Sequence, residues 1–193
     1  MTEFLCRLFV KDHERVQEAR VRRAYGTLCS VVGILLNILL FVGKFIVGTI
    51  SGSLAIRADA VNNLTDALSQ AISLLSFRMA AKPADRDHPF GHARIEYVAS
   101  MIVSMLILLV GYELFRDSIG LLLHPVVTEL RWVSIVVLGA SVLVKLWLGL
   151  FNRAVGKKID SEVLRATMTD SLSDAAATTA VLIASLVQQF TEQ

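Results

Sequence analysis

The stretches ADAVNNLTDA, Ala58–Ala67, and RATMTDSLSDA, Arg165–Ala175, are the most informative parts of this chain. Both stretches lie in long apolar runs, and each carries two polar residues at four-residue spacing: Asn62 and Asp66, and Asp170 and Asp174. Residues at positions i and i+4 share one face of a helix. A carboxylate at the centre of a bilayer costs at least about 2.5 kcal/mol, so such residues generally face the bundle interior and mark a functional site. Two such faces opposed would form a cage of oxygens, which suits a hard divalent cation.

The composition indicates a membrane protein. Hydrophobic residues make up 54% of the 193 positions, and the mean hydropathy is +0.61, which is more than a soluble domain of this size needs. A helix of about 20 residues crosses a hydrocarbon core of about 30 Å. We therefore expect an all-α, polytopic membrane helix bundle with five transmembrane helices. The expected spans are Tyr25–Ile50, Leu54–Ala80, Ile95–Leu123, Leu130–Val155 and Glu162–Phe190.

Lysine and arginine residues set the expected orientation, because they favour the cytoplasmic side of short connections. They concentrate in residues 1–24 and in the connections that follow the second and fourth spans. The N-terminus is therefore expected inside, with residues 1–24 as a cytoplasmic arm and residues 25–190 as the transmembrane domain. The net charge of +2 comes without a basic patch interleaved with aromatic residues, so we expect no nucleic-acid partner.

This topology predicts that the two polar pairs lie at similar depths. The second span enters from the outside near Leu54, so Asp66 lies about twelve residues, or ~18 Å, into the bilayer. The fifth span enters from the inside near Glu162, which puts Asp170 and Asp174 roughly 12 to 18 Å deep. All three carboxylates are therefore expected near mid-membrane, where they can serve one site.

The motifs of this chain resemble those of the cation diffusion facilitator family, over essentially the whole chain after Tyr25. The resemblance is carried by Gly52-Ser53 with ADAVNNLTDA, by PADRDHPFGHARIE at Pro83–Glu96, and by RATMTDSLSDA. It implies export of divalent transition metals in exchange for protons. It also implies that two residues on each of transmembrane helices two and five hold the transported ion. The matching positions here are Asn62, Asp66, Asp170 and Asp174.

The donor atoms of these four residues bear on which metal is carried. Every candidate donor is an oxygen, whereas zinc-transporting members of the family usually include a histidine. Oxygen donors favour Mn²⁺, Mg²⁺ or Ca²⁺, and imidazole adds affinity for Zn²⁺. Within a transition-metal family we expect Mn²⁺, as in the manganese-type branch, with Fe²⁺ or Zn²⁺ as alternatives. Because three carboxylates repel one another without metal, we expect the empty site to hold protons, as counter-ions, and the filled site to release them.

Further polar residues stand out beside these four. Lys44 and Asp59 are each about eight residues from the middle of the Gly/Ser turn, so an antiparallel hairpin would pair them, with a direct ligand role for Asp59 as the alternative. Lys145 in the fourth span has no obvious partner and either snorkels or faces the interior. The loop after the second span offers a second metal site, although a loop held by its own polar residues is the favoured interpretation. That set comprises Asp85, His88 and His92.

The resemblance also implies a homodimer embedded in membrane lipid, with the bacterial cytoplasmic (inner) membrane as the expected location, and no enzymatic activity. Usual members have six transmembrane helices and a C-terminal cytoplasmic domain. Since the sequence stops at Gln193, we expect a chain truncated after its fifth helix, without that domain. Two alternatives to an alternating-access, proton-coupled exporter stay open. One is a truncated, non-transporting fragment or dimerising scaffold, and the less favoured one is an intramembrane metallohydrolase.

Overall fold

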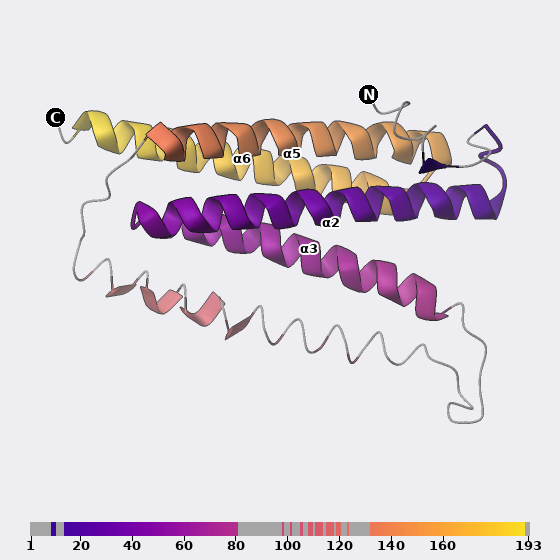
Figure 1. Cartoon of the computed structure of the whole chain (residues 1–193), viewed down its shortest axis with the longest axis horizontal. Coiled ribbons are helices and arrows are strands. Elements are labelled where there is room, and N and C mark those ends of the chain that lie inside the picture. The colour runs from indigo at the N-terminus through magenta and orange to yellow at the C-terminus, as the bar shows by residue number, and fades with distance from the viewer. Residues whose placement is uncertain are drawn as a thin grey trace. The chain divides into compact units, whose positions relative to one another are not determined.

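Long helices make up the computed structural model of the chain (Figure 1). The structure describes residues 9–10, 14–80, 98, 101, 105, 108–109, 111–113, 115–117, 119–120, 123 and 132–191. The helices are α2 (Ala19–Ile50), α3 (Leu54–Ala80), α5 (Trp132–Ile159) and α6 (Glu162–Thr191). They confirm that the first, second, fourth and fifth expected segments are helical.

Two of these helices extend by a turn or more beyond the expected spans, and α6 ends at Thr191, just past the expected Phe190. α2 begins at Ala19 rather than at Tyr25, because Val21, Tyr25 and Cys29 form one buried stripe at four-residue spacing. The end of the expected N-terminal arm is therefore part of the helix. α5 continues past Val155 to Ile159, and its last turn carries two lysines, where cations interact favourably with the helix dipole.

The expected third span, Ile95–Leu123, lies largely outside the described residues. Each residue that is described between positions 98 and 123 is helical. Within the described part of the chain, two helices are long and apolar enough to cross a membrane: Arg20–Ile50 and Trp132–Ile159. The other two long helices, α3 and α6, carry the polar pairs and so are less apolar. A five-span topology therefore remains a prediction.

The chain forms two compact units. One consists of residues 1–36 and 129–193, and the other of residues 37–128. α5 and α6 belong to the first unit, whereas α3 and the C-terminal part of α2 belong to the second. Each unit therefore contains a helical hairpin.

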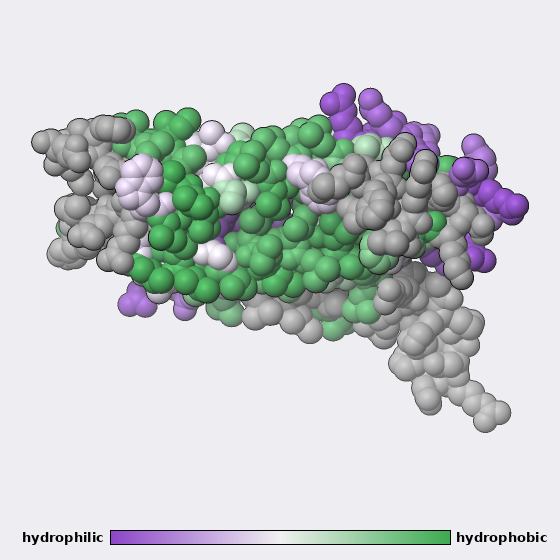
Figure 2. Space-filling model, turned by 45° about the horizontal axis from the view of Figure 1, so that its top comes forward, coloured by the Kyte–Doolittle hydropathy of each residue, from purple (hydrophilic) through white to green (hydrophobic). Residues whose placement is uncertain are grey.

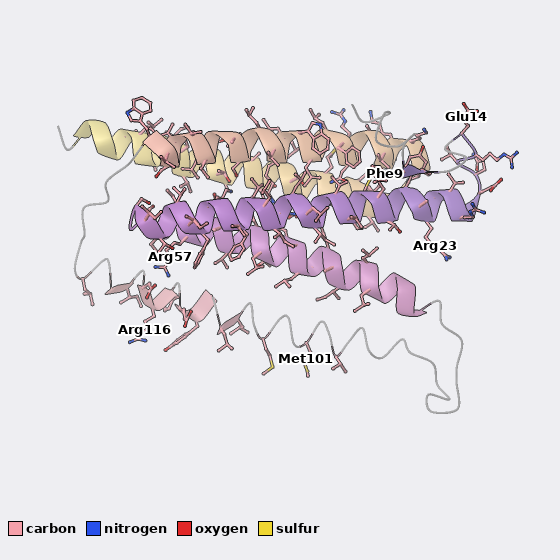
Figure 3. All side chains as sticks on the ribbon, in the orientation of Figure 1. Phe9, Glu14, Arg23, Arg57, Met101 and Arg116 are labelled. Atoms are coloured by element: carbon pink, nitrogen blue, oxygen red, sulfur yellow. The ribbon has the colours of Figure 1, made fainter. Side chains whose placement is uncertain are left out.

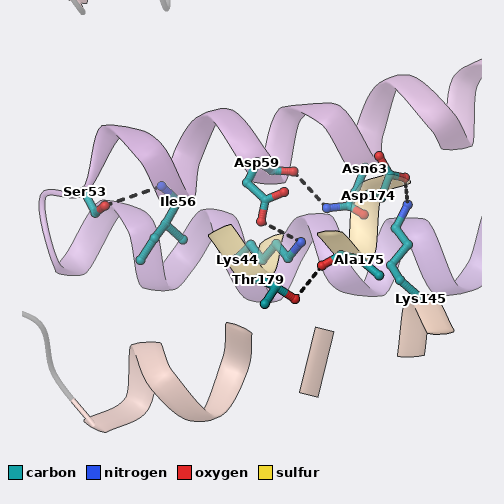
Figure 4. Close-up of polar contacts among 9 residues, drawn as sticks. All are labelled: Lys44, Ser53, Ile56, Asp59, Asn63, Lys145, Asp174, Ala175 and Thr179. Atoms are coloured by element: carbon teal, nitrogen blue, oxygen red, sulfur yellow. Dashed lines mark hydrogen bonds and ion pairs between the residues drawn. The ribbon is translucent and has the colours of Figure 1, made fainter. Parts of the chain in front are cut away.

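The hairpin of the second unit turns at Ser51–Ser53, as its Gly/Ser composition predicted. Gly52 has a φ of 65°, a left-handed conformation that glycine adopts without steric cost. The Ser53 backbone amide donates to the Gly48 carbonyl at 3.0 Å, which closes the end of α2. Ser53 Oγ then accepts a 3.4 Å hydrogen bond from the Ile56 amide and caps α3 (Figure 4). The two helices approach closely, because a Cβ on Gly48 would lie 2.9 Å from the Arg57 amide nitrogen.

The hairpin of the first unit turns at Asp160 and Ser161. Asp160 has a φ of 49°, and its carboxylate accepts a 3.1 Å hydrogen bond from the Arg165 guanidinium. Ser161 Oγ caps α6 by accepting from the Leu164 amide at 3.4 Å. From this turn, α5 and α6 run side by side along their length (Figure 1). This contact brings α5 residues against the α6 face that carries Asp174.

The hydrophobic core of the first unit gathers around the start of α2 and the C-terminal half of α5. Trp147 and Phe151 stack with ring centroids 5.3 Å apart. Tyr25 is fully buried, and its hydroxyl bonds the Lys158 ammonium at 2.8 Å. The remaining core residues are Val10, Val21, Cys29, Leu148, Val155, Ile159 and Leu164. This core lies at the end of the unit for which the positive charges predict a cytoplasmic location.

Hydrophobic side chains cover much of the described surface that faces the viewer in Figure 2. Large apolar side chains such as Leu39, Leu143 and Leu150 are exposed over more than half of their surface. Charged side chains such as Glu14 and Arg23 project from the N-terminal residues (Figure 3). A surface of this kind suits a bilayer rather than water.

Candidate metal centre

The first polar pair lies on α3. Asn62 and Asp66 are one helical turn apart, with Asn62 exposed and Asp66 half-buried. α3 is fixed to α2 by the Lys44 ammonium, which lies 2.8 Å from the Asp59 carboxylate (Figure 4). Lys44 is fully buried and the Asp59 side chain is 8% exposed. The ion pair predicted from the register of the hairpin is therefore confirmed.

This ion pair lies just before the first candidate ligand on α3. The Asn63 side-chain amide donates to the Asp59 carbonyl at 2.8 Å, which reinforces the same turn. A buried charge needs a partner in a low-dielectric environment. Lys44 and Asp59 neutralise each other, and so they hold α3 in a defined rotation about its axis.

The second polar pair lies on α6. Asp170 is exposed and Asp174 is buried, at 9% of its full exposure. The Lys145 ammonium of α5 lies 2.5 Å from Asp174 Oδ2, and the Lys145 side chain is 1% exposed (Figure 4). Of the two alternatives for Lys145, the structure selects the interior one. Its partner is one of the candidate metal ligands.

Sequence reasoning missed the partner of Lys145, although a signal for it existed. Lys145 precedes Asp160 by about as many residues as Asp174 follows it, so an antiparallel hairpin brings the two side chains level. The same argument identified the pair of Lys44 and Asp59. Both buried lysines of these hairpins are thus matched with an aspartate across the turn.

A polar stripe on α5 accompanies Lys145. The stripe comprises, in chain order, Ser134, Ser141, Lys145 and Asn152. Successive members are seven, four and seven residues apart, and these spacings put them on one helix face. All are at most 1% exposed. Within the described part of the chain, the Oγ atoms of Ser134 and Ser141 and the Oδ1 of Asn152 are buried without a hydrogen-bond partner. Such atoms are uncommon in native structures and invite a functional explanation.

The two candidate pairs belong to different units. Asn62 and Asp66 lie in the unit of residues 37–128, and Asp170 and Asp174 lie in the other unit. A single ion shared by all four is therefore a proposal. The second candidate set, Asp85, His88 and His92, lies outside the described residues.

The chain is thus a helical membrane domain with carboxylates in its apolar segments. Residues 30–193 match a family model described as the cation efflux transmembrane domain. That match covers most of the chain, and the chain therefore belongs to the cation diffusion facilitator, or cation efflux, family. The resemblance inferred from the three motifs is confirmed.

Curated relatives agree with this assignment. The chain is 31% identical to an uncharacterized transporter, MJ0449, of Methanocaldococcus jannaschii, over 84% of this chain and 56% of the relative. It is 32% identical to the manganese efflux system protein MneS of Bacillus subtilis, over 86% and 57%. It is 34% identical to the cation-efflux pump FieF of Cronobacter sakazakii, over 83% and 54%. The chain spans about half the length of the curated relatives it matches.

Proposed function

We propose that this chain is the membrane part of a secondary transporter that exports divalent transition metals, Mn²⁺ foremost, in exchange for protons. The transport site consists of Asn62, Asp66, Asp170 and Asp174. The protein works by alternating access as a homodimer in a bacterial cytoplasmic membrane. Asp85, His88 and His92 are the candidate set for a second, cytoplasmic metal site, and the favoured alternative is a loop held by its own polar residues.

One observation carries this proposal. Asp174 is buried in an apolar helix, and its carboxylate already contacts a cation, the Lys145 ammonium. A buried carboxylate of this kind is costly in a membrane unless a positive charge accompanies it. Asp170 precedes it by one turn on the same helix. Asp174, the buried member of the α6 pair, therefore attracts positive charge within the hydrophobic interior.

The donor set supports Mn²⁺ as the preferred substrate. One amide oxygen and three carboxylates are hard ligands, which suit Mn²⁺ better than the softer imidazole and thiolate ligands do. MneS, which is 32% identical to this chain, is named as a manganese efflux system protein. Fe²⁺ and Zn²⁺ are the competing substrates, because affinity for most sites rises from Mn²⁺ through Fe²⁺ to Zn²⁺.

The test is metal flux into proteoliposomes that contain the 193-residue chain. We expect Mn²⁺ uptake to exceed that of Zn²⁺ and Cd²⁺, and to fall to the background of empty liposomes in Asp66→Ala and Asp174→Ala. Asp117→Ala is a matched control, because its carboxylate lies 3.6 Å from the Arg57 guanidinium and its side chain is about half exposed. Such an exposed pair contributes about 1 kcal/mol at most.

Two results would contradict the proposal. Mn²⁺ flux that survives in Asp66→Ala would exclude Asp66 from the transport site. No flux of any metal through folded protein would favour a non-transporting scaffold. Proton coupling has its own test, since Mn²⁺ flux should slow when a pH gradient is collapsed at constant membrane potential.

A further inference from the structure

The Lys145 ammonium contacts the Asp174 carboxylate, which a bound metal would need as a ligand. The ammonium lies 2.5 Å from Asp174 Oδ2, and both side chains are almost fully removed from the surface. If Asp174 binds a divalent ion, that ion and the ammonium compete for the same carboxylate. The ion pair is therefore part of the site's energetics rather than only a link between α5 and α6.

The charges of the site also indicate that Lys145 contributes to the energetics of metal binding. Asp66, Asp170 and Asp174 carry three negative charges, and Lys145 carries one positive charge. With the ammonium included, the ionised groups balance one divalent cation. Without it they exceed a divalent cation by one charge, which would hold the metal more tightly and release it less readily.

A second resting place for the ammonium lies one turn away. Ser141 is four residues before Lys145 on the same face of α5, is fully buried, and has an Oγ without a hydrogen-bond partner. Side chains in a helix lean toward its N-terminus, so the stem of Lys145 extends over the turn that contains Ser141. A serine hydroxyl can accept a hydrogen bond from an ammonium. Ser141 can therefore receive the charge when it leaves Asp174.

We propose that Lys145 is a tethered counter-cation of the transport site. Its ammonium holds Asp174 while the site is empty, and it moves toward Ser141 when a divalent metal takes its place. Lys145 thus acts as a positioning residue that limits metal affinity and speeds metal release. This inference rests on the proposed transport function. It extends that function by naming the group that resets the empty site.

The experiment is a calorimetric titration of the purified 193-residue chain with Mn²⁺ alone, paired with flux measurements. Lys145→Met should lower the Mn²⁺ dissociation constant at least about tenfold, because no ammonium competes for Asp174. Its maximal flux should fall together with its KM, because the ion leaves the site slowly. Ser141→Ala should weaken Mn²⁺ binding by about threefold to tenfold, since the displaced ammonium loses an acceptor. Lys145→Arg keeps the charge and should bind Mn²⁺ more weakly than Lys145→Met does.

Lys44→Met is the matched control, because Lys44 is equally buried and equally paired with an aspartate. Its loss should weaken the fold without tightening Mn²⁺ binding. If Lys145 only stabilises the fold, Lys145→Met should likewise weaken the fold without tightening Mn²⁺ binding. Unchanged or weaker Mn²⁺ binding by Lys145→Met, in a chain whose wild type binds Mn²⁺, would overturn the counter-cation role and leave the transport function standing.

Two further outcomes are decisive. No Mn²⁺ binding by either the wild type or Lys145→Met would contradict the transport function, and the counter-cation role with it. If Lys145→Met does not fold, Ser141→Ala decides, because its small change keeps the ion pair intact. Unchanged Mn²⁺ affinity in folded Ser141→Ala would then overturn the proposed movement of the ammonium.

Discussion

Breaking the ion pair between Lys44 and Asp59 should cost much of the stability of the α2–α3 hairpin. At a separation of 2.8 Å and an effective dielectric constant of about 20, the direct attraction is ~6 kcal/mol. Desolvation of two buried charges offsets much of this attraction. Removing one partner leaves the other charge buried and uncompensated, so Lys44→Met should destabilise the chain by about 3–5 kcal/mol. Removing both charges should cost far less than either single change.

A double-mutant cycle measures this coupling. Lys44→Met, Asp59→Leu and the double variant would each be unfolded in mixed micelles, with helicity followed by circular dichroism. We expect both single variants to lose several kcal/mol and the double variant to recover most of that loss. Single variants within about 1 kcal/mol of the wild type would refute the reasoning, because the pair would then behave as an exposed salt bridge. Additive losses would refute it as well.

The remaining predictions concern packing and metal choice. Gly48→Ala should destabilise the hairpin by about 1–3 kcal/mol, because its Cβ would lie 2.9 Å from the Arg57 backbone nitrogen. Gly139→Ala is the control, since nothing lies within 4 Å of a Cβ at that position. Thermal unfolding should show that Gly139→Ala leaves the stability unchanged or raises it. An equal loss of stability in both variants would contradict the close approach of α2 and α3 at Gly48. Asn62→His should shift competition flux from Mn²⁺ toward Zn²⁺, since imidazole raises affinity for Zn²⁺. An unaltered preference would argue against Asn62 as a ligand.

Much of the fold follows from sequence periodicity and turn chemistry. The Gly/Ser turn at residues 51–53 and the apolar length of the flanking segments predicted the α2–α3 hairpin, and the described boundaries of α3 agree with the prediction. The register of that hairpin also predicted the Lys44–Asp59 pair. Local rules succeed here because a tight turn fixes which residues of two antiparallel helices are level.

Features that depend on packing between helices could not be predicted from the sequence. Asp170 and Asp174 have the same chemistry and lie on one helix face, yet one is exposed and the other buried. Periodicity names a face but does not say which neighbour covers it. The start of α2 at Ala19 likewise depends on core contacts made by Val21 and Tyr25. The pairing of Lys145 with Asp174 differs from these two features, because the register of the α5–α6 hairpin is sufficient to predict it.

We propose that one ion binds to residues of two helices, α3 and α6. Equilibrium dialysis with ⁵⁴Mn²⁺ on the purified chain tests it most directly, with Asp66→Ala and Asp174→Ala beside the wild type. We expect one specifically bound Mn²⁺ for each wild-type chain and comparable loss of that ion in both variants. Specific binding that survives removal of either carboxylate would contradict it.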